Sequence, residues 1–338
     1  MTSFRLSHLR PAFCALALFF SAAAAPATGN DMAVNPDVQS FIANMVELHE
    51  MDAPALTRLF SGRAPNAAVL KLIAPPASPK QRSWQRYRSR FLDSVRIQNG
   101  LKFWQKNAAT LKKAKQRYGV PEEIIVAIIG IETIYGQNTG NFSALEALAT
   151  LAFYYPPRAE FFRQELEQLL LLARENRRPA EHYYGSYAGA LGIPQFMPGS
   201  LRRYAVDFDD DGVIDLTNSV EDAIGSVAHF LSQHGWLPGA PIAVPAHLPV
   251  PPDPRWLEAG IRPTLPVREL LAAGVIANAD PEQNVTLVDL VTPDEATEYW
   301  LGYENFYVIT RYNRSSFYAM SVYQLAEAIR QEKTGVLR

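Results

Sequence analysis

Apolar residues recur at helical spacing over most of the chain. From 37 to 72 they return every three or four positions, which predicts short helices that end at a proline-rich segment. The stretch 124–134 is apolar on nearly every side, a pattern typical of a buried helix. Segments 145–153 and 161–173 predict two more helices, so the first two thirds of the chain should be mainly helical.

The pattern changes after Trp236. Proline-rich turns alternate with short valine and isoleucine runs at 241–250 and 285–291, which predicts a small β-containing insertion. Aromatic residues and then another helical pattern return between 300 and 330. The predicted fold class is therefore mainly α, with a helical core, an N-terminal helical region and a small β-containing insertion.

Composition excludes several classes of protein. The 338 residues carry 32 lysines and arginines against 34 aspartates and glutamates, and 48% of the residues are hydrophobic. A basic nucleic-acid binder and a disordered chain are both excluded by this balance. A disulfide framework and a thiolate zinc site are excluded because Cys14 is the only cysteine.

The first 27 residues predict a secretory signal peptide. Arg5 and Arg10 precede a mostly apolar run at 11–20, and small residues follow to Ala27. The run is shorter than the about 20 residues that span a bilayer, and Cys14 lies inside it, where it is poorly placed for lipid attachment. We expect an exported protein without a transmembrane span or lipid anchor. The alternative is a buried N-terminal helix.

A basic segment with interleaved aromatic residues occupies 80–117. It contains twelve lysines and arginines opposed by the single acid Asp93. One interpretation is a solvated helix face whose aromatic side chains turn toward the core. The other is a groove wall for an anionic polymer.

Glu132 is the strongest candidate for catalysis. It lies inside the apolar run IIGIETIYG, where burial disfavours the charged carboxylate and raises its pKa. A carboxyl group that holds its proton near neutral pH can act as a general acid. The glycines Gly130 and Gly136 would allow close approach of a ligand. The alternative is a structural glutamate paired with an arginine or a helix end.

The segment 207–215, DFDDDGVID, resembles the start of an EF-hand loop. Acids at loop positions 1, 3 and 5 and glycine at position 6 suit a Ca²⁺ ion, which prefers hard oxygen ligands. Position 12 is Asn218 instead of the usual glutamate. A merely solvated acidic loop is the alternative.

Five motifs appear in one order that resembles the MltB family of lytic murein transglycosylases. They lie at 125–136, 155–162, 185–198, 222–228 and 234–236, and include the stretch GSYAGALGIPQFMP. The resemblance covers about 80–330. It implies a lysozyme-like helical core that cleaves the β-1,4 bond between N-acetylmuramic acid and N-acetylglucosamine in peptidoglycan.

The resemblance also implies roles for single residues. Glu132 would act first as acid and then as base, forming a 1,6-anhydromuramoyl end without water. No second acid that could serve as nucleophile stands near it in the sequence, as most retaining glycosidases would require. The substrate-binding residues would be Tyr87, Arg158, Ser186, Gln195, Tyr312, Asn313 and Tyr318. A structural Ca²⁺ would be held by Asp207, Asp209, Asp211, the Val213 carbonyl and Asp222, and the chemistry would need no cofactor.

These inferences predict a signal peptide at 1–27, a helical region at 28–118, a catalytic core with the EF-hand-like loop at 119–236, a β-containing excursion at 237–295 and a closing segment at 296–338. The expected location is the periplasm. The expected partners are peptidoglycan glycan strands and cell-wall synthesis proteins, with no nucleic acid. Two rival functions remain: a hydrolytic muramidase, which needs a second carboxylate to activate water, and a non-catalytic peptidoglycan-binding scaffold, which does not need Glu132.

Overall fold

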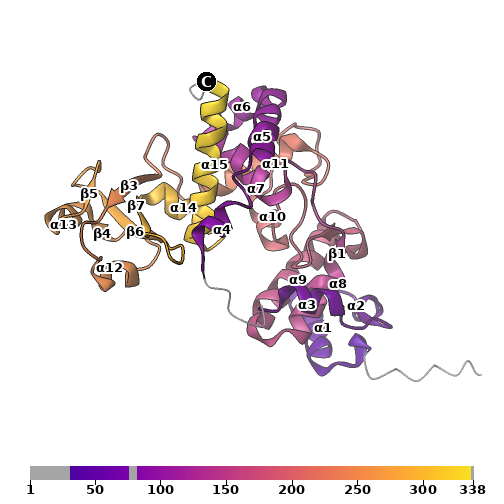
Figure 1. The fold of residues 1–338 in the computed structure, drawn as a ribbon. Helices are drawn as coiled ribbons and strands as arrows, with labels where there is room; N and C mark the ends of the chain where they lie inside the picture. Colours follow the sequence, from indigo (N-terminus) through magenta and orange to yellow (C-terminus); the bar gives the residue numbers. More distant parts are fainter. Residues whose placement is uncertain (1–30, 76–81, 336–338) are drawn as a thin grey trace, which may run out of the picture. The chain divides into compact units, whose positions relative to one another are not determined.

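The computed structural model describes residues 31–75 and 82–335 (Figure 1). The predicted signal peptide lies outside the described residues. The chain divides into two compact units, Met1–Ala64 and Pro65–Arg338. Among the described residues, no helix is both long enough and apolar enough to cross a membrane.

Three helical elements form the described part of the first unit. Each begins at an Asp or Asn side chain that accepts a backbone N–H of the first turn, as an N-cap does. Phe41 and Phe60 meet edge to face with ring centroids 6.3 Å apart. The elements are η1 (Met32–Val34), α1 (Pro36–His49) and α2 (Ala53–Phe60).

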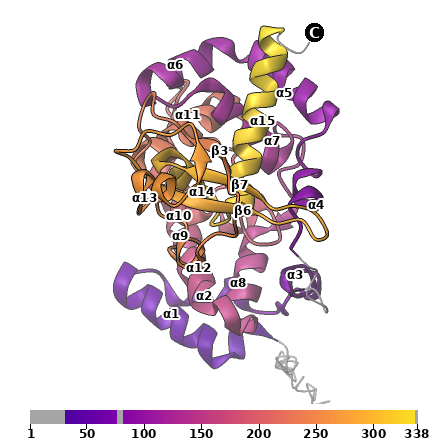
Figure 2. The same ribbon diagram turned by 60° about the vertical axis from the view of Figure 1, so that its left-hand side comes forward.

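Helix α7 (Glu122–Thr133) is the centre of the second unit. Nearly all of its side chains are buried, as its apolar sequence predicts. It packs against α5, α6, α11 and α15, and Figures 1 and 2 both show α15 and α5 beside it. The other helices of this part of the unit are α4 (Trp84–Arg88), α5 (Ser94–Lys106), α6 (Ala108–Tyr118), α10 (Pro198–Tyr204), α11 (Val220–Gln233), α14 (Glu304–Tyr312) and α15 (Ser316–Thr334). Helix α3 (Ala67–Ile73) packs instead against α8 (Ala144–Tyr154).

The basic segment contributes aromatic side chains to this core. Trp84, Phe103 and Trp104 are buried, and Tyr87 and Phe91 are half-buried against them. For these aromatics, the solvated-face interpretation of the segment is the better description.

A helical pair and a two-stranded ladder adjoin the core. The helices α8 (Ala144–Tyr154) and α9 (Ala159–Glu175) pack against each other, and α10 packs on α9. Strand β1 (Phe142–Ser143) pairs antiparallel with β2 (Tyr184–Gly185). Single 3-10 turns, η2 (Pro156–Arg158) and η3 (Ala180–His182), complete this region.

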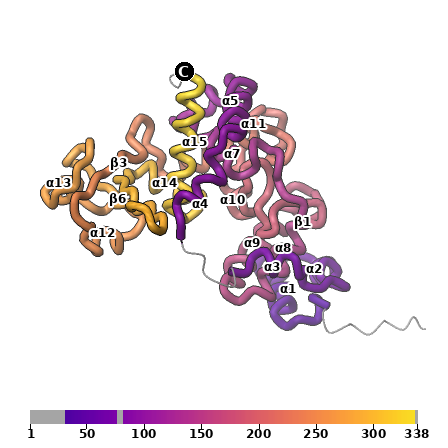
Figure 3. The backbone as a smooth tube through the Cα atoms, viewed as in Figure 1, coloured from indigo at the N-terminus to yellow at the C-terminus, as the bar shows by residue number. Residues whose placement is uncertain are grey.

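The β-containing insertion is an antiparallel sheet with its own small core. Its strand order is β4-β6-β7-β3-β5, and Val288 of β6 lies opposite Trp300 of β7. Figure 3 shows β3 and β6 gathered with α12 and α13. The elements are β3 (Ala243–His247), α12 (Pro254–Glu258), β4 (Leu265–Pro266), α13 (Val267–Ala272), β5 (Ile276–Ala277), β6 (Asn284–Leu290) and β7 (Glu298–Gly302). A mainly helical chain with a small β insertion is therefore confirmed.

Candidate active site

Glu132 lies one residue before the end of α7. The helix ends there because Ile134 and Tyr135 both adopt left-handed backbone conformations, with φ of 53° and 61°. A left-handed conformation costs free energy for any residue other than glycine, and more for a β-branched residue such as Ile134. The acid is therefore presented at a sharp turn and is only partly exposed.

Tyr135 holds this turn in place. Its hydroxyl donates a hydrogen bond to the Arg96 carbonyl at 2.9 Å. A Cβ atom added at Gly130 would lie 2.6 Å from that hydroxyl oxygen, and one added at Gly100 would lie 2.5 Å from it. Both positions thus need glycine. Sequence analysis missed Tyr135, although Gly130 within the apolar run was the available signal.

Thr133 joins the end of α7 to the glycine-rich loop. Its hydroxyl donates to the Ile193 carbonyl at 2.8 Å and accepts the Gly136 N–H at 3.0 Å. The side chain is fully buried. Sequence analysis missed this residue too. The bond fixes the position of the acid relative to the loop that carries Gln195.

The carboxyl of Glu132 has one hydrogen-bond donor among the described side chains. The Tyr318 hydroxyl, from α15, donates to its Oε1 at 2.6 Å. Burial raises the pKa of Glu132 to about 7, against the smaller lowering effect of the Tyr318 hydrogen bond. The group is therefore poised to hold or release a proton near neutral pH.

Two further tyrosines lie around this pair. The rings of Tyr312 and Tyr318 stack with centroids 6.4 Å apart, and the Tyr312 hydroxyl donates to the Pro194 carbonyl at 2.6 Å. Burial, and then the negative charge of Glu132, raises the pKa of Tyr87, Tyr312 and Tyr318. All three therefore remain neutral hydroxyl groups at physiological pH.

Ser186 and Gln195 lie in the glycine-rich loop and brace it. The Ser186 hydroxyl oxygen accepts the Ala188 and Ala190 N–H groups at 3.3 and 3.1 Å. The Gln195 amide nitrogen donates to the Thr139 carbonyl at 3.0 Å and to the Gly192 carbonyl at 2.9 Å. The Ser186 hydroxyl proton and the Gln195 Oε1 atom have no partner among the described residues.

Two predicted substrate-binding residues have no contact with this group in the described part of the chain. Asn313 is exposed just after α14. Arg158 is exposed, and its guanidinium lies over the Phe161 and Phe162 rings, 4.4 and 5.1 Å from their centroids. The structure therefore brings Tyr87, Tyr312 and Tyr318 to Glu132, but not these two.

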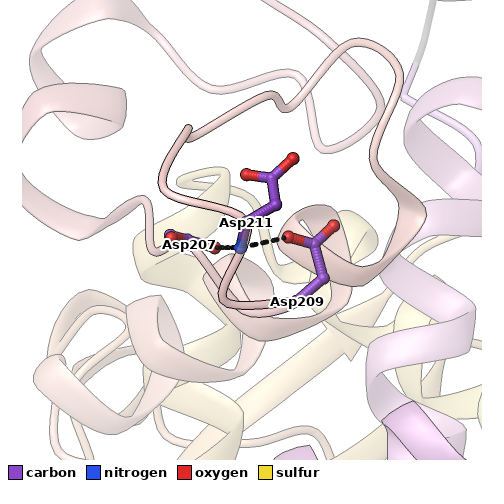
Figure 4. A group of neighbouring side chains, drawn as sticks. All are labelled: Asp207, Asp209 and Asp211. Carbon is purple, nitrogen blue, oxygen red and sulfur yellow. Dashed lines mark hydrogen bonds between the residues drawn. The ribbon is translucent and has the colours of Figure 1, made fainter.

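Three aspartates of the acidic loop form a candidate metal centre (Figure 4). One ligand oxygen from each of Asp207, Asp209 and Asp211 can be chosen so that all lie within 4.8 Å of one another. The Asp211 N–H donates to Asp207 and Asp209 at 3.1 and 3.3 Å, and the Gly212 N–H donates to Asp207 at 2.8 Å. These bonds curl the loop around its own carboxylates.

The other two predicted ligands are not among the three clustered carboxylates. Asp222 is fully buried, and its two carboxylate oxygens accept the Phe208 and Asp215 N–H groups at 2.7 and 2.8 Å. Asp222 therefore braces both ends of the loop, and it lies close enough to Asp209 for the charge of that residue to act on it. Val213 donates its N–H to Asp211 at 2.8 Å. The role of both residues as ligands stays a prediction.

The architecture around α7 defines a class of protein. A helical core that presents a single acid with a raised pKa beside neutral tyrosines is that of a lysozyme-like enzyme. A protein-family model described as a transglycosylase SLT domain matches residues 33–327. The chain belongs to this family of lytic transglycosylases.

Individual relatives agree over most of the chain. The membrane-bound lytic murein transglycosylase B of Escherichia coli is 43% identical over 312 residues, which make up 89% of this chain and 84% of that protein. The solved structure of the soluble lytic transglycosylase SltB1 from Pseudomonas aeruginosa is 45% identical, with a TM-score of 0.81, and covers 88% of this chain and 100% of its own. Slt35 from E. coli, solved in complex with calcium, is 41% identical, with a TM-score of 0.80, over 91% of this chain and 96% of its own.

A more distant structure was solved with a ligand. SltB3 from P. aeruginosa, in complex with NAG-anhNAM-pentapeptide, is 32% identical, with a TM-score of 0.72. The match covers 87% of this chain and 78% of that one. The resemblance found in the sequence motifs is thereby confirmed at the level of family, fold and enzyme class.

Proposed function

We propose that this chain cleaves the β-1,4 bond between N-acetylmuramic acid and N-acetylglucosamine in peptidoglycan and leaves a 1,6-anhydromuramoyl end. The observation that carries the proposal is Glu132, a partly exposed carboxyl with a pKa of about 7 and one hydroxyl donor. A group with this pKa can serve as an acid and then as a base at one pH. The names and bound fragments of the relatives support the substrate.

In the proposed reaction Glu132 first donates a proton and later takes one up. Protonated Glu132 gives its proton to the glycosidic oxygen while the bond from that oxygen to the muramoyl C1 breaks. The resulting carboxylate, which accepts the Tyr318 hydrogen bond, then takes the proton of the muramoyl 6-hydroxyl as that oxygen bonds to C1. Glu132 is protonated again at the end, and no water is consumed.

The surroundings of Glu132 favour this route over hydrolysis. An activated water would call for a second carboxylate. Within residues 31–75 and 82–335, no carboxylate influences the pKa of Glu132, which responds to burial and Tyr318. The acids Asp207 and Asp211 are engaged by backbone N–H groups of their own loop. The muramidase alternative therefore lacks its base among the described residues.

Several residues would then bind the glycan. We propose that Ser186 donates its hydroxyl proton and that Gln195 accepts through Oε1, because these are the groups that the loop leaves unpaired among the described residues. Tyr87 and Tyr312 would form walls of the sugar site beside Glu132. Arg158 and Asn313, whose side chains are exposed, would also contact the glycan.

We also propose a structural Ca²⁺ on the acidic loop. The three clustered carboxylates offer hard oxygen ligands of the kind that Ca²⁺ prefers, and they fit such an ion. The calcium complex of Slt35 supports the assignment. Asp207, Asp209 and Asp211 would hold the ion, with the Val213 carbonyl and Asp222 as further predicted ligands. When bound, the ion would neutralise the clustered negative charge and stabilise the loop.

The proposed setting follows from the substrate. A signal peptide at 1–27 would export the chain to the periplasm, where peptidoglycan strands are its substrate and cell-wall synthesis proteins are candidate partners. Neither nucleic acid nor a transmembrane span belongs to this proposal.

The experiment that tests the function is mass spectrometry of purified sacculi digested by the wild type and by Glu132→Gln. Anhydromuramoyl ends made by the wild type alone are expected. Reducing ends would instead identify water as the acceptor and favour the muramidase. If neither protein released soluble product, the non-catalytic scaffold would be the better description.

A further inference from the structure

A basic cavity of about 480 Å³ lies beside α14. Arg262, Arg311 and Arg314 line it together with Tyr307 and Thr310, and no acid is among its lining residues. Within the described part of the chain, none of these three guanidinium groups forms an ion pair with a carboxylate. Three unpaired positive charges around one cavity raise the local concentration of anions.

Tyr307 organises the arginines. The Arg262 Nε donates to the Tyr307 hydroxyl at 3.2 Å, and its guanidinium carbon lies 5.3 Å from the centre of that ring. The guanidinium of Arg311 lies 6.0 Å from the same centre. Such contacts leave most of the N–H groups of each guanidinium free to donate. The cavity thus presents oriented donors as well as charge.

The cavity is close in the chain to the catalytic group. Arg311 and Arg314 flank Tyr312 and Asn313, and Tyr312 stacks on the tyrosine that donates to Glu132. A smaller hollow of about 150 Å³ shares two lining residues, Gly260 and Ile261, with the cavity and is also lined by Arg82 and Ser316. Asp289 also lines this hollow and pairs with Arg82 at 3.7 Å, so the unpaired positive charge lies in the larger cavity.

We propose that this cavity binds carboxylates of the peptide carried by a muramoyl residue, an inference that rests on the proposed function. Guanidinium groups pair with carboxylates through two parallel hydrogen bonds. The sugar rings of a peptide-bearing strand are uncharged, so only its peptides offer the cavity an anion. SltB3 supports this choice, since that relative was solved with a sugar that bears a pentapeptide.

The test compares two forms of one substrate. Glycan strands with pentapeptide stems are used with the stem carboxylates free or converted to methyl amides. For the wild type, kcat/KM should be higher on the free form. In the Arg262→Gln/Arg314→Gln double variant, the ratio of the two kcat/KM values should fall by about tenfold, which corresponds to about 1.4 kcal/mol. Arg255→Gln is the matched control, because that exposed arginine is paired with Asp253 outside the cavity.

A binding experiment tests this proposal independently of the proposed function. Calorimetry in the Glu132→Gln background, with a soluble disaccharide pentapeptide, reports the cavity without turnover. An unchanged ratio together with unchanged binding in the double variant would overturn the proposal even if the wild type makes anhydro ends. Competition by inorganic phosphate or anionic vesicles, with no preference for free stems, would also overturn it and assign another anion. Single variants replace the double variant if its melting temperature falls.

Discussion

The molecule contains two acidic sites in which the same functional group is held in opposite ways. Glu132 is a lone carboxyl whose burial raises its pKa to about 7. Asp207, Asp209 and Asp211 are three carboxylates gathered on a surface loop, where backbone N–H groups donate to them. In the first site the environment favours the neutral acid, and in the second it gathers three carboxyl groups at the surface.

This difference teaches what each site can do. A carboxyl that is costly to ionise keeps its proton until a substrate oxygen takes it. Carboxylates that remain ionised side by side repel one another and attract a cation. Residue type alone does not separate these roles. Burial and the nature of the donors, a tyrosine hydroxyl in one case and peptide N–H groups in the other, separate them.

The largest expected effect is on turnover, where the two acidic sites should differ most. Glu132→Gln should lower turnover by about 10² to 10⁴-fold, because the variant has no proton to give. Asp209→Asn should leave turnover within about twofold at saturating calcium if the loop has no chemical role. Release of anhydromuropeptides from sacculi measures both. An equal loss in the Asp209 variant would show that the loop takes part in the reaction.

The next effect is on stability and its pH dependence. The folded state raises the pKa of Glu132 from 4.5 to about 7, so the folded protein retains a proton that the unfolded chain releases. The stabilising contribution of the protonated group is complete below about pH 4.5 and is lost as the pH rises through about 7. Glu132→Gln removes this pH-dependent loss, so its stability relative to the wild type should rise by about 3 kcal/mol between pH 4 and pH 8.

Denaturant unfolding of both proteins at several pH values checks this expectation. Glu123→Gln, on the same helix, is the control. A stability difference that does not change with pH would contradict the raised pKa of Glu132 and would weaken its assignment as the acid.

The acidic loop should respond to calcium and not to the state of Glu132. Calcium at one hundred times its dissociation constant should stabilise the wild type by about 2.7 kcal/mol. The variant in which Asp207, Asp209 and Asp211 are all asparagine should show no response, while Asp210→Asn should respond fully, since Asp210 pairs with Lys113 outside the group. Thermal unfolding in the presence of calcium or of EDTA measures this stabilisation in each protein. A full response in the triple variant would place the ion elsewhere.

The smallest expected effect is a shift in the pH dependence of activity, which reports the pKa of Glu132. Activity of the wild type should fall as the pH rises through about 7, because the acid must be protonated. Tyr318→Phe removes the hydrogen bond that lowers this pKa, so the fall should move to higher pH, with a stability loss of about 1 kcal/mol. A kcat/KM profile against pH tests the shift. Movement to lower pH would contradict the assigned role of Tyr318.

Local patterns in the sequence predicted much of the fold and the acid itself. The apolar runs that predicted helices near 124–134 and 145–153 correspond to α7 and α8. This prediction succeeded because a helix that is apolar on every side is stable only when it is buried in the protein core. Glu132 was identifiable because it interrupts such a stretch. The spacing of Asp207, Asp209 and Asp211 likewise predicted their convergence, which depends on neighbouring residues only.

The partners that tune each acid could not be predicted from spacing. The bond from Tyr318 to Glu132 joins residues 186 positions apart, and the bond from Tyr312 to Pro194 joins residues 118 apart. Such pairs depend on how helices pack, which a periodic pattern does not encode. Asp222, whose predicted role as a ligand stays a prediction, accepts two N–H groups of the loop, and these contacts were likewise not visible in the spacing.

Tyr318 lies on α15, the last of the described helices, so it can join Glu132 only after α15 has been synthesised. Glu132, the proposed catalytic acid, is synthesised in the middle of the chain, but the hydroxyl that tunes it belongs to α15, which ends at Thr334. A chain that stops before α15 carries the acid without its partner and without the helix that covers α7. We therefore expect a molecule that lacks α15, whether unfinished or clipped, to be inactive.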